Sequence, residues 1–142
     1  MLFGRHERTI RRILVVEDEP LVAFDNEQLL KDAGYEVVAT VDTLADARAV
    51  IESEELDLVL TDIRLAGDGD GTGVARIARG KGVPVLFVTA HRQDGADGLG
   101  VGLLAKPYSE KVLKNALDAL DRHLQGKRLR KLPAQLTLFE AV

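Results

Sequence analysis

Five short apolar runs divide the chain, and each one ends next to polar or charged residues. They are rich in branched side chains and strand-sized, which is typical of buried β-strands. Between most of them apolar residues recur at spacings of three and four, as in helices that cover one face. Strands that alternate with helices pair in parallel, so the sequence predicts an α/β fold with a doubly wound, five-stranded parallel sheet. The runs are 13–16, 35–41, 58–60, 84–88 and 101–105.

Residues that favour helix ends mark the helices between these strands. Pro20 suits the first position of a helix, and Gly34 suits the end of the same helix. Thr43 and Ser109 have side chains that cap helix amino termini. A short helix is expected around Val74, after a glycine-rich loop. The last helix carries one apolar stripe formed by Leu113, Ala116, Leu117, Leu120 and Leu124.

The length of 142 residues fits one domain with an ordinary hydrophobic core. We expect a basic amino-terminal arm over residues 1–12, a folded domain over 13–125 and a carboxy-terminal tail over 126–142. The chain has no cysteine, which excludes disulfides and thiolate sites. No apolar run has the roughly 18 residues of a membrane span, and the charged amino terminus does not resemble a signal peptide. We therefore expect a cytoplasmic protein without a membrane partner.

The residues at the carboxyl ends of the strands form the candidate site. Ligands of such sheets bind beyond these strand ends, so the side chains should converge. Three carboxylates brought together repel one another unless a cation lies between them, and Mg²⁺ prefers such oxygen ligands. A lysine and a hydroxyl group then complete a site for a phosphoryl group. These residues are Glu17, Asp18, Asp62, Thr89 and Lys106.

Four segments in this order resemble the signature segments of the receiver domain of bacterial response regulators. They are ILVVEDEP at 13–20, LVLTDIRL at 58–65, VLFVTA at 85–90 and LLAKPY at 103–108. The resemblance extends from residue 13 to about 124, and it implies a flavodoxin-like receiver fold. It further implies a stand-alone response regulator that receives a phosphoryl group from a histidine kinase or a histidine phosphotransfer protein. The output would be contacts with an unidentified downstream protein, as a monomer or a homodimer, without direct DNA binding.

The same resemblance implies roles for the acidic residues. Asp62 would be the phosphoacceptor and a ligand of Mg²⁺. Asp18 would bind the metal directly, and Glu17 mainly through water. The backbone carbonyl of Arg64 would be the third protein ligand.

The residues around the phosphoryl group follow in the same way. Lys106 and Thr89 would bind its oxygens, and the bond between Lys106 and Pro107 would be cis, a geometry realistic only before proline. Arg64 and His91 stand two residues after the phosphoacceptor and the threonine, so we expect both to tune the lifetime of the acyl phosphate.

The sequence departs from the family in two places. Leu103 stands where receivers commonly carry an aromatic switch residue. The segment 91–100 is short and rich in glycine, which predicts a shortened or mobile fourth helix. These features resemble a divergent alphaproteobacterial subgroup of single-domain receivers.

The tail segment 133–139 is apolar, so we expect it to pack on its own domain or on a dimer partner. It also resembles the Gln-Leu-x-Leu-Phe peptide that binds the bacterial sliding clamp.

Two other functions remain open for the same residues. A Mg²⁺-dependent phosphoesterase would also use Asp62 as its nucleophile. Such enzymes typically carry Asp-x-Asp, whereas Arg64 takes the second position here. An interaction module whose site is never phosphorylated would show the same sequence. The expected activity is therefore a signalling switch rather than an enzyme acting on a separate substrate.

Overall fold

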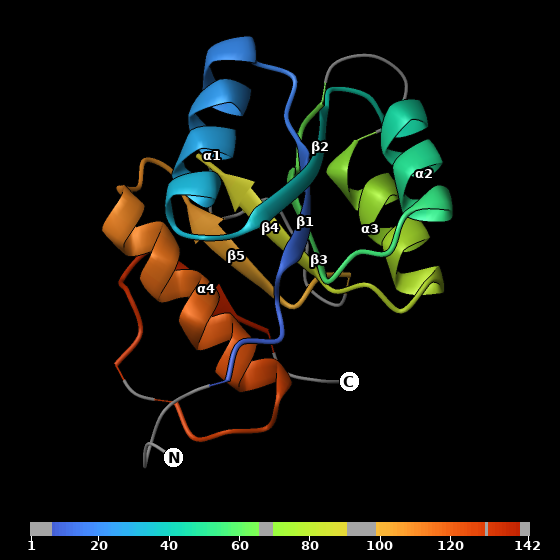
Figure 1. Cartoon of the computed structure of the whole chain (residues 1–142). Helices are drawn as coiled ribbons and strands as arrows, with labels where there is room; N and C mark the ends of the chain where they lie inside the picture. The colour runs from blue at the N-terminus through green and yellow to red at the C-terminus, as the bar shows by residue number, and fades with distance from the viewer. Residues whose placement is uncertain (1–6, 66–69, 91–98, 130, 140–142) are drawn as a thin grey trace.

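The computed structural model describes residues 7–65, 70–90, 99–129 and 131–139 of the chain. Helices cover both faces of one central sheet (Figure 1). The strands are β1 (Arg12–Val16), β2 (Glu36–Val41), β3 (Leu58–Asp62), β4 (Val85–Thr89), β5 (Gly102–Ala105) and β6 (Leu136–Leu138). The helices are α1 (Pro20–Asp32), α2 (Leu44–Ser53), α3 (Gly71–Gly80) and α4 (Glu110–Leu124).

The sheet confirms the predicted doubly wound α/β fold. Its strand order is β2-β1-β3-β4-β5-β6, and the first five strands in this order are parallel. One core joins α1 and α4 to one face of the sheet, and a second core joins α2 and α3 to the other face. Within the described residues, no helix is both long and apolar enough to cross a membrane.

A sixth strand extends the sheet beyond the five that the sequence predicts. β6 pairs antiparallel with β5, and the Ala105 N–H donates a hydrogen bond of 2.9 Å to the Gln135 carbonyl. Leu136 is buried against the core that contains α1 and α4. The apolar tail thus packs on its own domain, and part of the segment assigned to a tail belongs to the sheet.

The expected helix caps are present. The side chains of Thr43 and Ser109 accept hydrogen bonds from the backbone N–H groups of Asp46 and Val112, at the starts of α2 and α4. The apolar stripe of α4 is buried as predicted except at its end, where Leu124 is 40% exposed. The segment 91–98, where we expect the shortened fourth helix, lies outside the described residues.

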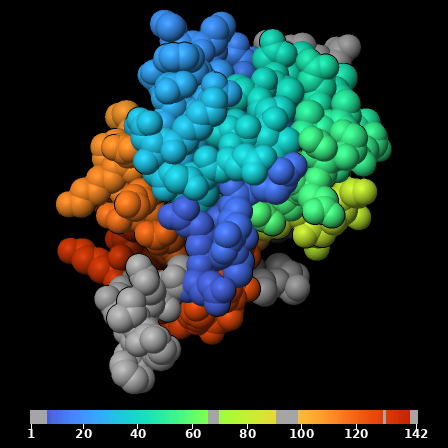
Figure 2. Space-filling view, viewed as in Figure 1, coloured from blue at the N-terminus to red at the C-terminus, as the bar shows by residue number. Residues whose placement is uncertain are grey.

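The described part of the amino-terminal arm is fixed to α4. The backbone N–H groups of Thr9 and Ile10 donate to the same carboxylate oxygen of Asp121, at 2.9 and 3.0 Å. The Gln125 side chain also donates to the Glu7 carbonyl. Figure 2 shows the blue amino-terminal segment lying against the orange-red atoms of this helix. α4 and the residue that follows it therefore hold residues 7–10 in place.

Candidate functional site

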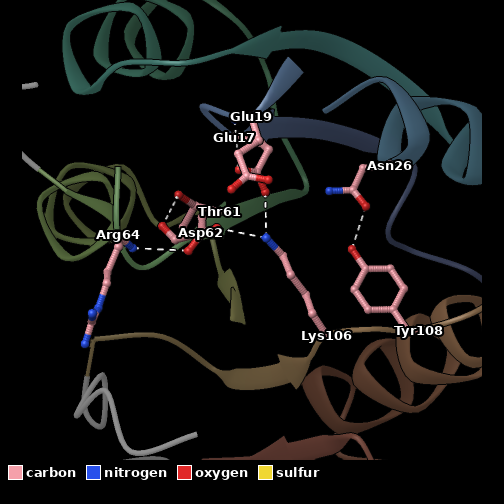
Figure 3. Close-up of polar contacts among 8 residues, drawn as sticks. All are labelled: Glu17, Glu19, Asn26, Thr61, Asp62, Arg64, Lys106 and Tyr108. Carbon is pink, nitrogen blue, oxygen red and sulfur yellow. Dashed lines mark hydrogen bonds and ion pairs between the residues drawn. The ribbon is translucent and has the colours of Figure 1, made fainter. Parts of the chain in front are cut away.

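The carboxyl ends of the parallel strands meet at one edge of the sheet, as the fold requires. Glu17 directly follows β1, Asp62 ends β3, Thr89 ends β4 and Lys106 directly follows β5. The strand register keeps neighbouring ends level, because Asp62 pairs with Val88 and Thr89 pairs with Ala105. Figure 3 shows the side chains of Glu17, Asp62 and Lys106 pointing toward one another. The predicted site residues thus come from adjacent strands.

Lys106 joins the two acidic strand ends. Its Nζ atom lies 2.8 Å from Oε1 of Glu17 and 2.9 Å from Oδ2 of Asp62. The side chain of Glu17 is only 2% exposed, whereas those of Asp62 and Lys106 are 16% and 20% exposed. Asp62 and Lys106 are therefore the parts of this triad that a ligand can reach.

For both Glu17 and Lys106, burial shifts the pKa in one direction and the contacts within the triad shift it in the other. Burial raises the pKa of Glu17 above its usual value, although hydrogen bonds from Lys106 and from the Glu19 backbone favour the carboxylate. Burial alone would lower the pKa of Lys106, but the hydrogen bonds and negative charges of Glu17 and Asp62 outweigh it and raise the pKa. The ammonium group of Lys106 therefore stays charged at neutral pH.

Backbone contacts fix the carboxylate of Asp62 at the end of β3. The Arg64 N–H donates to Oδ1 of Asp62 at 3.2 Å. The start of α3 lies against the same backbone, and the Gly71 N–H donates to the Ile63 carbonyl at 2.8 Å. A Cβ atom at Gly71 would lie only 1.9 Å from the Asp62 carbonyl oxygen. Sequence reasoning missed Gly71, and its only signal was a glycine at the start of the helix that follows the site loop.

The other predicted site residues do not belong to this triad. Thr89 is 2% exposed, and its carbonyl accepts a hydrogen bond from the Lys106 N–H at 2.8 Å. The bond between Lys106 and Pro107 is cis, as expected. Figure 3 shows the guanidinium group of Arg64 directed away from Asp62. His91 lies outside the described residues, so its predicted tuning role stays a prediction.

Asp18 lies next to Glu17, at a hollow that both residues line. Glu17 and Asp18 line a cavity of about 320 Å³ together with Thr40 and Asp42 of the neighbouring strand and loop. Among the side chains that the structure describes, no group of three or more His, Cys, Asp or Glu residues could hold a metal ion. The structure therefore brings Glu17 and Asp62 together through Lys106 and does not join all three carboxylates into one cluster.

A second polar contact lies beside Lys106 (Figure 3). The Tyr108 hydroxyl donates a hydrogen bond of 2.6 Å to the side-chain oxygen of Asn26, which is 5% exposed. Burial raises the pKa of Tyr108, so the phenol stays protonated and remains a donor. This bond ties α1 to the segment that follows Lys106. Sequence reasoning missed it, because an asparagine inside a helix carries no signal of such a partner.

Comparison with known proteins identifies the family. The model of the response regulator receiver domain matches residues 13–118. The phyllosphere-induced regulator PhyR of Methylorubrum extorquens is 36% identical over an alignment of 101 residues, and the match covers 68% of this chain and 38% of that protein. The first curated relatives extend well beyond the match, since the chain spans 38% of that PhyR and 55% of the regulator PdtaR of Mycobacterium tuberculosis.

Solved structures agree with this assignment. The response regulator PhyR from Brucella abortus is 32% identical with a TM-score of 0.69, covering 84% of this chain and 51% of that one. A CheY-like receiver domain protein from Methanospirillum hungatei is 27% identical with a TM-score of 0.68, covering 81% of this chain and 99% of that one. Sequence, fold and strand-end residues agree, and the chain belongs to the response regulator receiver family.

Proposed function

We propose that this receiver domain is a Mg²⁺-dependent phosphoacceptor switch in which Asp62 takes a phosphoryl group. The observation that carries the proposal is the contact of Lys106 with both Asp62 and Glu17. A fixed ammonium group beside a reachable carboxylate is what transfer of a phosphoryl group to that carboxylate requires, because such transfer depends on positioning and charge stabilisation.

The chemical step follows from these contacts. An oxygen of Asp62 attacks the phosphorus of the donor, an acyl phosphate bond forms, and the bond from phosphorus to the donor breaks. With a phosphohistidine donor, the leaving imidazole nitrogen keeps the bonding electrons and takes up a proton. Lys106, which already contacts Oδ2 of Asp62, then pairs with the negative oxygens of the phosphoryl group. Thr89 at the neighbouring strand end is the proposed hydroxyl partner.

The charges of the triad and of Asp18 favour a divalent cation, and Mg²⁺ is the proposed ion. The formal charges of Glu17, Asp18 and Asp62 exceed the single positive charge of Lys106, and a divalent cation would reduce this imbalance. Mg²⁺ binds through one or two carboxylates and keeps several waters, so it does not need a preformed cluster of three side chains. Asp18, Glu17 through water, Asp62 and the Arg64 carbonyl are the proposed ligands. Bound Mg²⁺ supplies positive charge to the phosphoryl oxygens.

A histidine kinase or histidine phosphotransfer protein is the proposed donor, and the output is a contact with a downstream protein. The donor must bring its phosphohistidine to Asp62, and therefore must touch the rim of the site. On α1, which begins three residues after Glu17, Leu21 and Phe24 are 81% and 59% exposed. Exposed apolar side chains next to a functional site are typical of a protein contact.

Intact-mass measurement tests the proposal. The chain is incubated with acetyl phosphate and Mg²⁺, and we expect one added phosphoryl group. Asp62→Asn should abolish the adduct, and EDTA should abolish it in the unmutated chain. Asp42→Asn is the matched control, since Asp42 lines the neighbouring cavity and is not a proposed acceptor. No adduct with acetyl phosphate or with a phosphorylated donor protein would overturn the proposal in favour of an unphosphorylated interaction module.

A further inference from the structure

The outer edge of β5 holds the chain's own last strand. Residues of β6 pair antiparallel with Gly102, Leu103 and Leu104. Hydrogen bonds continue beyond both ends of this pairing, since Ala105 donates to the Gln135 carbonyl and the Phe139 N–H donates to Val101 at 3.0 Å. The edge of β5 is thus a binding site for an extended segment, and 135–139 is its ligand.

Two residues fit this edge to a strand. Gly102 allows close approach, because a Cβ atom there would lie 2.7 Å from the Thr137 carbonyl oxygen. Leu136 is 5% exposed and belongs to the same core as Leu104. Backbone pairing together with a pocket for every second side chain is how sheets bind added strands.

The connection between α4 and β6 leaves the helix at a turn and then runs beside a cavity, with Leu132 packed against the core. α4 ends at a turn in which Gly126 has a φ of +71° and its N–H donates to the His123 carbonyl at 3.1 Å. A cavity of about 910 Å³ lies between α4 and residues 131–135. β6 itself pairs with β5 and contacts the core, and the same contacts can form with a strand that another chain supplies.

We propose that the β5 edge also binds segment 135–139 of a second copy, so that two chains exchange their carboxy-terminal strands. Exchange replaces each contact by the same contact from the other chain, and only the connection over 126–134 changes its course. Nine residues reach at most about 30 Å when extended, which is enough to leave one domain and reach a neighbour. The chain's own strand has an effective concentration in the mM range at the β5 edge. The fraction of exchanged chains therefore grows as the protein concentration approaches that range.

Disulfide trapping between two different variants tests the exchange, since the chain has no cysteine of its own. Leu103 and Thr137 are opposite each other in the β5–β6 pairing. Opposite residues of antiparallel strands have Cα atoms about 4.5–5.5 Å apart, within reach of a disulfide. We mix Leu103→Cys chains with tagged Thr137→Cys chains under mild oxidation, where a mixed disulfide requires the strand of one chain on the edge of another.

The expected product is a mixed disulfide dimer, identified by its mass. Its yield should rise about tenfold for a tenfold increase in concentration while exchange is rare, as mass action requires. Adding Gly102→Val to the Leu103→Cys chain should abolish it, because the side chain meets the Thr137 carbonyl. Adding Gly126→Val to the Thr137→Cys chain should raise the yield about fivefold, because a valine strains the left-handed turn.

Two results would overturn the inference. The first is the absence of a mixed disulfide up to about 1 mM, the scale at which exchange competes with the attached strand. The second is a mixed disulfide whose yield ignores Gly102→Val, since it would come from random collision. Light scattering on the unmutated chain gives an independent measurement, and a mass that stays monomeric over the same concentrations would also contradict exchange. None of these measurements depends on phosphorylation, so their outcome is separate from that of the proposed function.

Discussion

Adding one methyl group at position 71 tests whether the start of α3 sets the position of Asp62. A Cβ atom at Gly71 would lie 1.9 Å from the Asp62 carbonyl oxygen and 2.8 Å from Cα of Ile63. Real Cβ atoms stay at least 3.0 Å from such atoms. Both neighbours are backbone, so no side chain can rotate away. Gly71→Ala must therefore move the end of β3 and the start of α3 apart.

The expected loss of phosphorylation rate follows from the size of this movement. The separation from the Asp62 carbonyl oxygen must grow from 1.9 to at least 3.0 Å, a displacement of about 1 Å. A misplacement of about 1 Å in a reacting group costs on the order of 100-fold in rate. Overpacking costs about 1–3 kcal/mol of stability, and a domain with about 5–15 kcal/mol remains folded. We therefore expect a folded protein that is phosphorylated about 100-fold more slowly.

The assay is the rate of phosphoryl uptake from acetyl phosphate, followed by intact mass, beside circular dichroism to show that the variant is folded. Gly80→Ala is the matched control, because it lies in the same helix and its Cβ atom would meet nothing within 4 Å. The control should keep the rate and gain up to about 1 kcal/mol of stability from helix propensity. A Gly71→Ala protein that reacts at the rate of the unmutated chain would refute the argument.

Three further predictions concern contacts outside the phosphoacceptor. Asp121→Ala should lower the free energy of unfolding by about 3 kcal/mol at pH 7, because it leaves the buried N–H of Ile10 and the half-buried N–H of Thr9 without their acceptor. Burial alone would raise the pKa of Asp121, but its hydrogen bonds outweigh this effect and lower the pKa. The stabilisation by the Asp121 carboxylate is thus fully present above its usual pKa and is lost as the pH falls through its lowered pKa in the folded chain. Urea unfolding measures this, and a loss of unfolding free energy in Asp121→Ala that is equal at all pH values would contradict it. Phe24→Ala should slow transfer from a donor protein about tenfold and leave acetyl phosphate unaffected, and equal slowing with both donors would exclude a docking role. Tyr108→Phe should cost about 1–2 kcal/mol in thermal unfolding, because the buried Asn26 oxygen loses its donor, and an unchanged melting temperature would argue against that bond.

The sequence predicted the elements whose cause is local. The five parallel strands follow from apolar runs, and the caps at Thr43 and Ser109 follow from hydrogen bonds within one helical turn. The convergence of Glu17, Asp62 and Lys106 was also predictable, because parallel strands bring their carboxyl ends to one edge.

The features that sequence reasoning missed depend on contacts between distant segments. β6 is three residues long, and only the open edge of β5 makes it a strand. The interaction of Asn26 with Tyr108 joins residues 82 positions apart, and neither residue type indicates the other. Leu124 continues the apolar spacing of α4, yet it is 40% exposed because the core ends one turn earlier.

The attachment of the amino-terminal arm to Asp121 has a consequence for synthesis. The acceptor of the Thr9 hydrogen bond follows 112 positions later in the chain. At about 5–20 residues per second, the arm waits on the order of ten seconds on the ribosome before α4 exists. During that time Ile10, which is 2% exposed in the folded chain, lacks the part of its core that α4 supplies. The contacts of Thr9 and Ile10 with Asp121 thus form only after α4 has been made.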